Sequence, residues 1–202
     1  MLYNFPTLPF TLLFKLLYRL KVEGLENFPR EGALILVANH SSYFDPLVLG
    51  VAIPRRINWM VMKAYYDLWW LGWFFKLSYA FRVDVDRPDI SAIKHAFRVL
   101  EGGGIVGIFP EGTRSLDGRL GKGKTGAALL SLKSETPILP VAIKGAFEAY
   151  PPKAIWPKLH PITIRIGRLL TFEGIDRRSI DEEGLSTATE KIMSAIRGLM
   201  EV

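Results

Sequence analysis

The chain has no cysteine among its 202 residues and only three histidines. The absence of cysteine excludes disulfides, thiolate metal sites and cysteine nucleophiles, so any catalysis must use other side chains. A membrane-spanning run is also lacking near the N-terminus, where the apolar stretch Leu8–Leu20 would reach only ~20 Å as a helix. Because the hydrocarbon core of a bilayer is roughly 30 Å thick, this stretch is not expected to span it alone.

Positive charge exceeds negative charge in a chain of rather apolar composition. Lys and Arg number 26 against 20 Asp and Glu, which gives a net charge of +6, and 49% of the residues are hydrophobic. A basic balance indicates an anionic partner, which could be nucleic acid, an acidic membrane surface or a phosphorylated substrate. The length predicts one domain that is large enough to bury a substantial core.

The stretch Leu8–Leu20 indicates contact with a membrane surface. Its polar positions Thr11, Lys15 and Arg19 are spaced by four, so on a helix they form one narrow stripe on an apolar cylinder. We predict a membrane-surface helix, and the alternative is a helix packed on the core. The aromatic segment Tyr65–Phe81 would also suit the headgroup layer, but taken alone it could equally belong to the core.

Apolar runs typical of strands alternate along the chain with runs typical of helices. This alternation predicts an α/β fold with a mostly parallel central sheet flanked by helices. The expected strands are Ala33–Ala38, Asn58–Met62, Phe81–Val85, Gly104–Phe109, Ile138–Ile143 and Ile162–Ile166. The expected helices are Phe44–Ala52, Tyr65–Tyr79, Ile90–Leu100, Thr125–Ser134 and Ser186–Met200. The proline-rich segment Tyr150–Pro161 is interpreted as an excursion between two strands.

The stretch NHSSYFD, Asn39 to Asp45, follows the apolar run ALILVA, which is typical of a strand buried on both faces. His40 is therefore expected just beyond the carboxyl end of a strand, where open α/β sheets form their ligand crevices. A tight turn would bring Asp45 back to the imidazole, fixing its tautomer and leaving Nε2 free to take a proton. The alternative is that Asp45 serves the dipole of the next helix and His40 is simply exposed.

A second buried-strand pattern, IVGIFPEGTRS, also leads into a polar turn. Parallel strands would place Glu111 and Arg114 of this turn at the same edge of the sheet as His40. Arg114 offers a planar fork that suits phosphate, and Gly112 allows a ligand to approach the backbone closely. A structural salt bridge between Glu111 and Arg114 is the alternative interpretation.

Together, NHSSYFD and FPEGTRS resemble the lysophosphatidic acid acyltransferase family, whose members carry an N-H-x-x-x-x-D block and an F-P-E-G-T-R-S block. The segment FRVDVDR, ending at Arg87, is similar to the family's F-x-D-R segment, and PILPVAI (Pro137–Ile143) is similar to its P-I-V-P-V block. The similarity extends over about residues 32–145. The stretch GKGKTGAA departs from the family's F-K-K-G block, because Gly123 and Thr125 do not match it.

The resemblance implies a glycerolipid acyltransferase fold, with a membrane-surface helix in residues 1–24 and an acyltransferase domain in residues 25–202. It also implies the transfer of a fatty acyl chain from acyl-CoA or acyl carrier protein to the free sn-2 hydroxyl of 1-acylglycerol-3-phosphate. The product would be phosphatidic acid. The alternative acceptor is another lysolipid, such as lysophosphatidylethanolamine.

The resemblance also assigns roles to the residues singled out above. His40 would be the general base that deprotonates the acceptor hydroxyl, and Asp45 would orient it. Residues that bind the glycerol-phosphate end would be Glu111, Gly112, Thr113 and Arg114, with Arg87 as a further phosphate ligand. No metal and no cofactor besides the acyl donor is expected. The expected partners are the lysophospholipid, the acyl donor and a membrane surface at its cytoplasmic face, and no nucleic acid.

Two other classes of protein are alternatives to an acyltransferase. The segment GRLGKGKT, Gly118 to Thr125, matches the phosphate-loop pattern G-x-x-x-x-G-K-[ST] letter for letter, but such a loop must follow directly from a buried strand. A membrane-binding module without catalysis would explain the charge and the apolar segments but would leave both polar turns unused. His95 and His160, which have no carboxylate partner in the pattern, are interpreted as surface or packing residues.

Overall fold

A computed structural model describes residues 8–66, 80–84, 89–172 and 180–201. Among these residues, seven strands form one sheet in the order β1-β7-β6-β2-β5-β3-β4. Neighbouring strands pair in parallel except β6 and β7, which run antiparallel. The strands are β1 (Lys21–Glu23), β2 (Leu34–Ala38), β3 (Ile57–Met62), β4 (Phe81–Val83), β5 (Ile105–Ile108), β6 (Ile138–Lys144) and β7 (Thr163–Ile166). The mostly parallel central sheet predicted from the sequence is confirmed.

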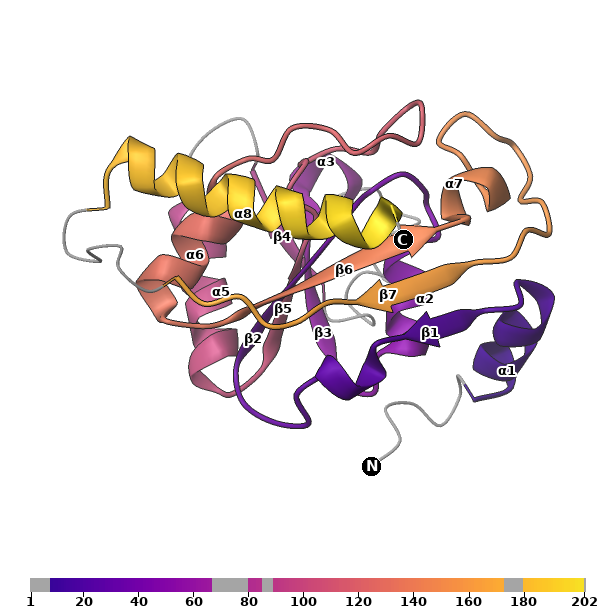
Figure 1. Ribbon diagram of the computed structural model, residues 1–202, viewed down its shortest axis with the longest axis horizontal. Helices are drawn as coiled ribbons and strands as arrows, with labels where there is room; N and C mark the ends of the chain where they lie inside the picture. The colour runs from indigo at the N-terminus through magenta and orange to yellow at the C-terminus, as the bar shows by residue number, and fades with distance from the viewer. Residues whose placement is uncertain (1–7, 67–79, 85–88, 173–179, 202) are drawn as a thin grey trace.

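Helices cover both faces of this sheet, with α8 in front of it and α2 behind it in Figure 1. The helices are α1 (Leu8–Leu17), η1 (Leu25–Asn27, a 3-10 helix), α2 (Asp45–Ala52), α3 (Lys63–Tyr66), α5 (Ile90–Glu101), α6 (Gly126–Ser134), α7 (Ala146–Ala149) and α8 (Glu182–Glu201). No helix within the described ranges is both long enough and apolar enough to cross a membrane.

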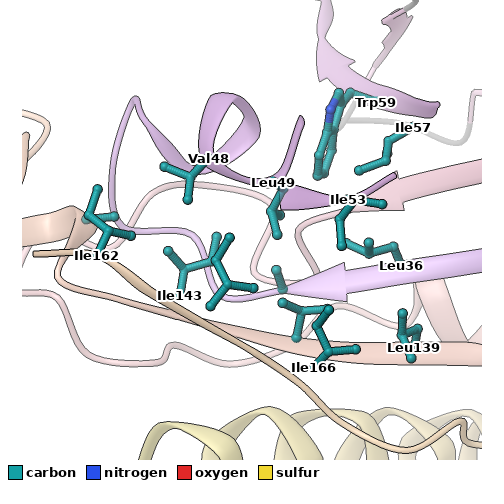
Figure 2. Close-up of a cluster of buried hydrophobic side chains, with 14 of the residues drawn as sticks. Leu36, Val48, Leu49, Ile53, Ile57, Trp59, Leu139, Ile143, Ile162 and Ile166 are labelled. Carbon is teal, nitrogen blue, oxygen red and sulfur yellow. The ribbon is translucent and has the colours of Figure 1, made fainter. Parts of the chain in front are cut away.

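The central strand β2 is buried along its whole length, as its unbroken apolar sequence predicts. Its side chains alternate between two cores, because successive residues of a strand point to opposite faces. Leu36 packs with Val48 and Leu49 of α2 on one face (Figure 2), whereas Ile35 and Val37 pack with α5, α6 and α8 on the other. The strand that leads to His40 is therefore fixed on both sides.

The first helix ends three residues earlier than predicted, at Leu17 instead of Leu20. Arg19 takes a left-handed backbone conformation (φ 43°), and Leu20 N–H closes the turn by donating to Lys15 O at 2.9 Å. The chain then turns into β1, where Lys21 N–H donates to Ile162 O at 2.9 Å. This tertiary pairing, which has no local sequence signal, ends the helix.

Other elements differ from the prediction mainly at their ends. Strand β1 and helix α7 were not predicted, because three and four residues are too short for a periodic pattern. Helix α8 begins at Glu182 instead of Ser186, since Asp181 Oδ1 accepts the Gly184 N–H at 2.8 Å and caps the helix. The expected helix Tyr65–Tyr79 lies mostly outside the described residues.

Candidate active site

Two loops meet at the carboxyl edge of the sheet because β2 and β5 pair in parallel, with Val37 opposite Ile108. The segment 39–45 follows β2, and the segment 109–115 follows β5. Asn39 lies directly after β2. Its side-chain amide donates to Ile143 O at 3.0 Å and accepts the Ile143 N–H at 2.7 Å. This buried amide takes the place of a backbone pair with β6, so the chain can leave the sheet at His40 without unpaired groups on β6.

His40 and Asp45 form the predicted hydrogen bond, with His40 Nδ1 and Asp45 Oδ2 separated by 2.8 Å. The same carboxylate oxygen accepts the backbone N–H groups of Ser41 at 2.7 Å and Ser42 at 2.8 Å. An oxygen that accepts two N–H groups acts as an acceptor toward the imidazole too, so Nδ1 carries a hydrogen, and in the neutral ring Nε2 is the acceptor nitrogen. Asp45 is fully buried, whereas the His40 side chain remains 18% exposed, so the ring can reach a substrate.

The face of the imidazole lies on a column of aromatic rings that sequence reasoning missed. Phe109 stacks on His40 with 3.9 Å between ring centroids and 13° between planes. Trp59 also stacks on Phe109, with 5.0 Å between ring centroids and 5° between planes. Phe109 belongs to the FPEGTRS stretch, so the motif had marked its position, but no pattern in a sequence indicates ring stacking between two loops.

Glu111 connects the two loops through backbone groups. Its Oε1 accepts the His40 N–H at 2.7 Å, and its Oε2 accepts the Gly121 N–H at 2.8 Å. His40 O in turn accepts the Ser115 N–H at 2.7 Å. Burial raises the pKa of the Glu111 carboxyl above its ordinary value, while the two backbone N–H groups act in the opposite direction.

The family resemblance implied a substrate contact for Glu111, and this contact stays a prediction. The side chain is buried and both of its oxygens are engaged with backbone, so it positions the backbone of His40.

Residues 112–114 of the turn are partly or fully exposed to solvent. Gly112 has a positive φ of 71°, a conformation that favours glycine, and Thr113 is exposed. The Arg114 guanidinium lies over the Tyr43 ring, with Cζ 3.8 Å from the ring centroid. Stacking on an aromatic ring holds the plane of the guanidinium.

Lys124 is a second cation at this turn. Its side chain lies so close to Gly112 that a Cβ at that glycine would be 2.9 Å from Lys124 Cε and 3.1 Å from Nζ. The backbone fixes this position, because Lys124 N–H donates to Pro110 O at 2.7 Å. Lys124 lies next to the turn 111–115 because of the path of the intervening loop. The spacing of these residues in the sequence does not predict that path.

Two further hypotheses from the sequence concern Arg87 and the segment 118–125. Arg87, expected as a phosphate ligand, is outside the described residues. The segment 118–125 begins well after β5 ends at Ile108 and only then leads into α6, which is not the strand–loop–helix arrangement of a phosphate loop.

The other two histidines fit the structural roles predicted for them. His95 packs on Phe81 with 4.5 Å between ring centroids, and burial together with Arg98 lowers the pKa of its imidazole. The exposed His160 has Nδ1 3.0 Å from Pro161 O. Within the described segments, no three His, Asp or Glu side chains are grouped so as to hold a metal ion.

Comparison with known proteins identifies relatives of the chain. A family model described as Acyltransferase matches residues 19–144. The 1-acyl-sn-glycerol-3-phosphate acyltransferase of Bacillus subtilis (strain 168) is 39% identical over 127 residues, which are 62% of this chain and 62% of that protein. The enzyme of the same name from Pseudomonas aeruginosa is 31% identical over 169 residues, which are 81% of this chain and 64% of that protein.

A solved structure is also similar. The crystal structure of the 1-acyl-sn-glycerophosphate (LPA) acyltransferase, PlsC, from Thermotoga maritima has a TM-score of 0.72 at 25% identity, covering 90% of this chain and 71% of that one. The match therefore spans most of the fold described above, although the chain spans less than two thirds of the length of the two curated relatives.

Proposed function

Because this chain belongs to the acyltransferase family, we propose that it transfers a fatty acyl chain to the free sn-2 hydroxyl of 1-acylglycerol-3-phosphate. The product is phosphatidic acid, and the donor is acyl-CoA or acyl carrier protein. The observation that carries the proposal is the hydrogen bond of 2.8 Å between His40 Nδ1 and the buried Asp45 carboxylate. This bond leaves a basic Nε2 at a loop that also presents an arginine. The names of the relatives supply the acceptor.

In the proposed mechanism His40 is the general base. Its Nε2 takes the proton of the acceptor hydroxyl while the oxygen attacks the thioester carbonyl, and the buried Asp45 carboxylate stabilises the imidazolium. Collapse of the tetrahedral intermediate breaks the carbon–sulfur bond, and the imidazolium returns its proton to the departing thiolate. Such a base contributes ~10²–10⁴-fold to the rate. No side chain needs to carry the acyl group, in keeping with a chain that has no cysteine.

The turn 111–115 is the proposed site for the phosphate of the acceptor. Arg114 supplies a fixed guanidinium, Gly112 and Thr113 supply an accessible backbone, and Arg87 is a further proposed ligand. Glu111 is assigned a positioning role, because its oxygens hold His40 and Gly121. The hydrogen bond from Ser115 N–H to His40 O places this turn directly beside the proposed base.

The acyl chains of donor and acceptor require contact with a bilayer, which we assign to residues 1–24 at the cytoplasmic face, with residues 25–202 as the catalytic domain. Helix α1 supports this assignment, because Leu12, Leu13, Leu16 and Leu17 are exposed to solvent. Its other side is anchored by Phe14 and Tyr18, which are buried and pack on Phe44 with ring centroids 5.4 and 5.1 Å apart. We therefore propose that the leucine face contacts the membrane, while the Phe14 face packs on the core.

The test is acyl transfer by the purified full chain in mixed micelles, with labelled acyl-CoA or acyl carrier protein as donor. Lysophosphatidic acid and lysophosphatidylethanolamine serve as competing acceptors, and His40→Ala is the inactive control. We expect diacyl product from lysophosphatidic acid and a loss of ~10²-fold or more in His40→Ala. Preferential acylation of lysophosphatidylethanolamine would refute the assigned acceptor. Retention of most of the turnover by a folded His40→Ala variant would refute the assigned base.

A further inference from the structure

The proline-rich loop, residues 151–161, exposes large apolar side chains at its tip. Ile155 is 82% exposed, Trp156 is 79% exposed and Leu159 is 71% exposed. Singly exposed apolar residues are normal on a protein surface, whereas three within five positions of one loop indicate a contact surface.

The loop is attached to the domain at both ends and by an internal bond, so the exposed tip is not a fraying terminus. At its start Tyr150 O accepts the Ser42 hydroxyl at 2.7 Å. At its end Ile162 N–H donates to Tyr18 O at 2.9 Å, and inside the loop Lys158 N–H donates to Ala149 O at 2.7 Å. Its four prolines, at positions 151, 152, 157 and 161, restrict the chain further. The apolar tip is therefore presented by a restrained support.

The two ends of the loop connect it with helix α1 and with the candidate active site. The Phe44 ring lies 5.1 Å from both the Tyr18 ring, directly after α1, and the Tyr150 ring at the start of the loop. Figure 1 shows α1 and the loop that follows α7 at the same end of the molecule. The exposed leucines of α1 and the exposed tip of the loop thus belong to one end of the protein, next to the segment that carries His40.

The charges of the proline-rich loop and of the α1 region indicate which partner binds this end of the protein. The loop contains Lys153 and Lys158, both exposed, and the α1 region contains Lys15 and Arg19, also exposed. Neither residues 8–20 nor residues 151–161 include an aspartate or glutamate. A second copy of the chain docking symmetrically through this end would bring like charges together, whereas an anionic bilayer offers both apolar and negatively charged layers.

We propose that the proline-rich loop is a second membrane-inserting element, which docks on an anionic phospholipid surface together with α1. Trp156 lies at the depth of the headgroups, where an indole can be half buried and half wet, and Ile155 and Leu159 enter the acyl region. Lys153 and Lys158 extend toward the phosphates. The inference rests on the proposed function, because it adds a contact that fixes the height of the acyltransferase site above the bilayer.

The absence of cysteine permits a direct test with single labels. The variants Trp156→Cys, Leu16→Cys and Ile90→Cys each carry one environment-sensitive fluorophore. The labelled full chains are mixed with vesicles of phosphatidylglycerol and phosphatidylcholine. Ile90, on α5, is an exposed apolar position outside both segments and serves as the control. We expect blue-shifted emission at positions 156 and 16 and water-like emission at position 90.

The outcomes separate the loop from the other assignments. A blue shift at position 16 with water-like emission at position 156 would overturn the proposal and leave α1 as the membrane contact. A blue shift at position 156 that grows with protein concentration in the absence of vesicles would show self-association and would also overturn it. Acyl transfer to a water-soluble short-chain acceptor tests the proposed function separately, because that reaction does not require a bilayer.

A matched pair of substitutions provides a second measure. Ile155→Ser should weaken partitioning to the same vesicles about tenfold, whereas Ile90→Ser should leave it unchanged. Activity on the short-chain acceptor should stay the same in both variants. Equal vesicle partitioning by the two variants would contradict insertion of the loop.

Discussion

The His40 imidazole is held at one edge and on one face. Asp45 fixes the edge through Nδ1, and Phe109 covers the face with ring centroids 3.9 Å apart. The backbone of the same residue is bound on both sides, by Glu111 at its N–H and by Ser115 at its carbonyl. A general base that must meet a proton at hydrogen-bond distance benefits from this restraint, because small displacements reduce the rate steeply.

At this scale we expect Asp45→Asn to lower kcat by ~10²–10⁴-fold, since the amide loses the negative charge and does not impose the same tautomer. Asp89 is a matched control, because its carboxylate also accepts backbone N–H groups at a helix start, from Ser91 and Ala92. Asp89→Asn should leave kcat within a few-fold. Steady-state kinetics and thermal unfolding of both variants test this prediction. An equal loss of kcat in both variants would show a general effect on folding.

Arg114→Ala should mainly raise KM for a phosphate-bearing acceptor, because the guanidinium is proposed to hold the phosphate in ground and transition states alike. Arg114→Lys should restore only part of the affinity, since an ammonium cannot reproduce a planar fork stacked on Tyr43. The measurement is KM for lysophosphatidic acid and for a lysolipid that lacks phosphate. If both values rise equally, Arg114 has a structural role instead.

At the scale of elements, strand β5 packs closely on the ring of Trp59, which stacks on Phe109. A Cβ on Gly107 would lie 2.5 Å from Trp59 Cε3 and 2.6 Å from Ile57 Cγ2, so only glycine fits there. Gly107→Ala should displace Trp59 and, through Phe109, the His40 ring. We expect a loss of about 1–3 kcal/mol in the free energy of unfolding and a lower kcat.

The control is Gly50→Ala in α2, where a Cβ meets no atom within 4 Å. This change should preserve kcat and stabilise the helix by about 0.5–1 kcal/mol. Denaturant unfolding and kinetics measure both quantities. A Gly107→Ala variant with unchanged kcat would show that the ring column does not orient His40.

Helix α1 has two faces that substitution should separate. Leu12→Ser with Leu16→Ser should weaken vesicle binding and leave the free energy of unfolding within ~0.5 kcal/mol, because both side chains are exposed. Phe14→Ala should cost about 3 kcal/mol of stability, because its ring is buried against Tyr18 and Phe44. Vesicle sedimentation and thermal unfolding are the two readouts. A double-serine variant that unfolds as readily as Phe14→Ala would assign the leucines to the core.

The parts that could be predicted from sequence are those with a local or periodic signal. Unbroken apolar runs identified β2 and β5, and parallel pairing then predicted that His40 and the FPEGTRS turn meet at one edge of the sheet. The antiparallel direction of β7, the early end of α1 at Arg19 and the stacking of Phe109 depend on contacts between distant residues. The backbone ligands of Glu111 likewise follow from the path of residues 116–121, which no pattern specifies.

At the scale of the whole molecule, an ion pair fastens the edge strand β1 to β7. Glu23 Oε2 lies 2.7 Å from Arg165 Nε, and Lys21 binds the same carboxylate. Hydrogen bonds from Lys21 and Arg165 lower the pKa of Glu23 from 4.5 to about 2. A lowered folded-state pKa gives stability that is present above pH 4.5 and is lost as the pH falls toward 2.

We therefore expect Glu23→Gln to lower Tm at pH 7 and to flatten the decrease of Tm between pH 4.5 and pH 2. The control is Glu190→Gln, whose carboxylate lies 3.7 Å from Arg197 with both side chains at least half exposed, so Tm at pH 7 should not change. Thermal unfolding over this pH range measures both variants. An unchanged acid profile in Glu23→Gln would contradict the linkage.

The pairing of the strands sets an order of events during synthesis. Strand β2 pairs with β5 and β6, and β1 pairs with β7. These N-terminal strands can therefore form their hydrogen bonds only after the later strands have been synthesised. On the ribosome, α1 and His40 emerge before Glu111, Ser115 and Ile143, the residues that hold the His40 segment in place. The exposed leucines of α1 are therefore synthesised before the residues that hold His40, the proposed base, in position. If α1 binds a membrane as proposed, attachment can precede the assembly of the candidate active site.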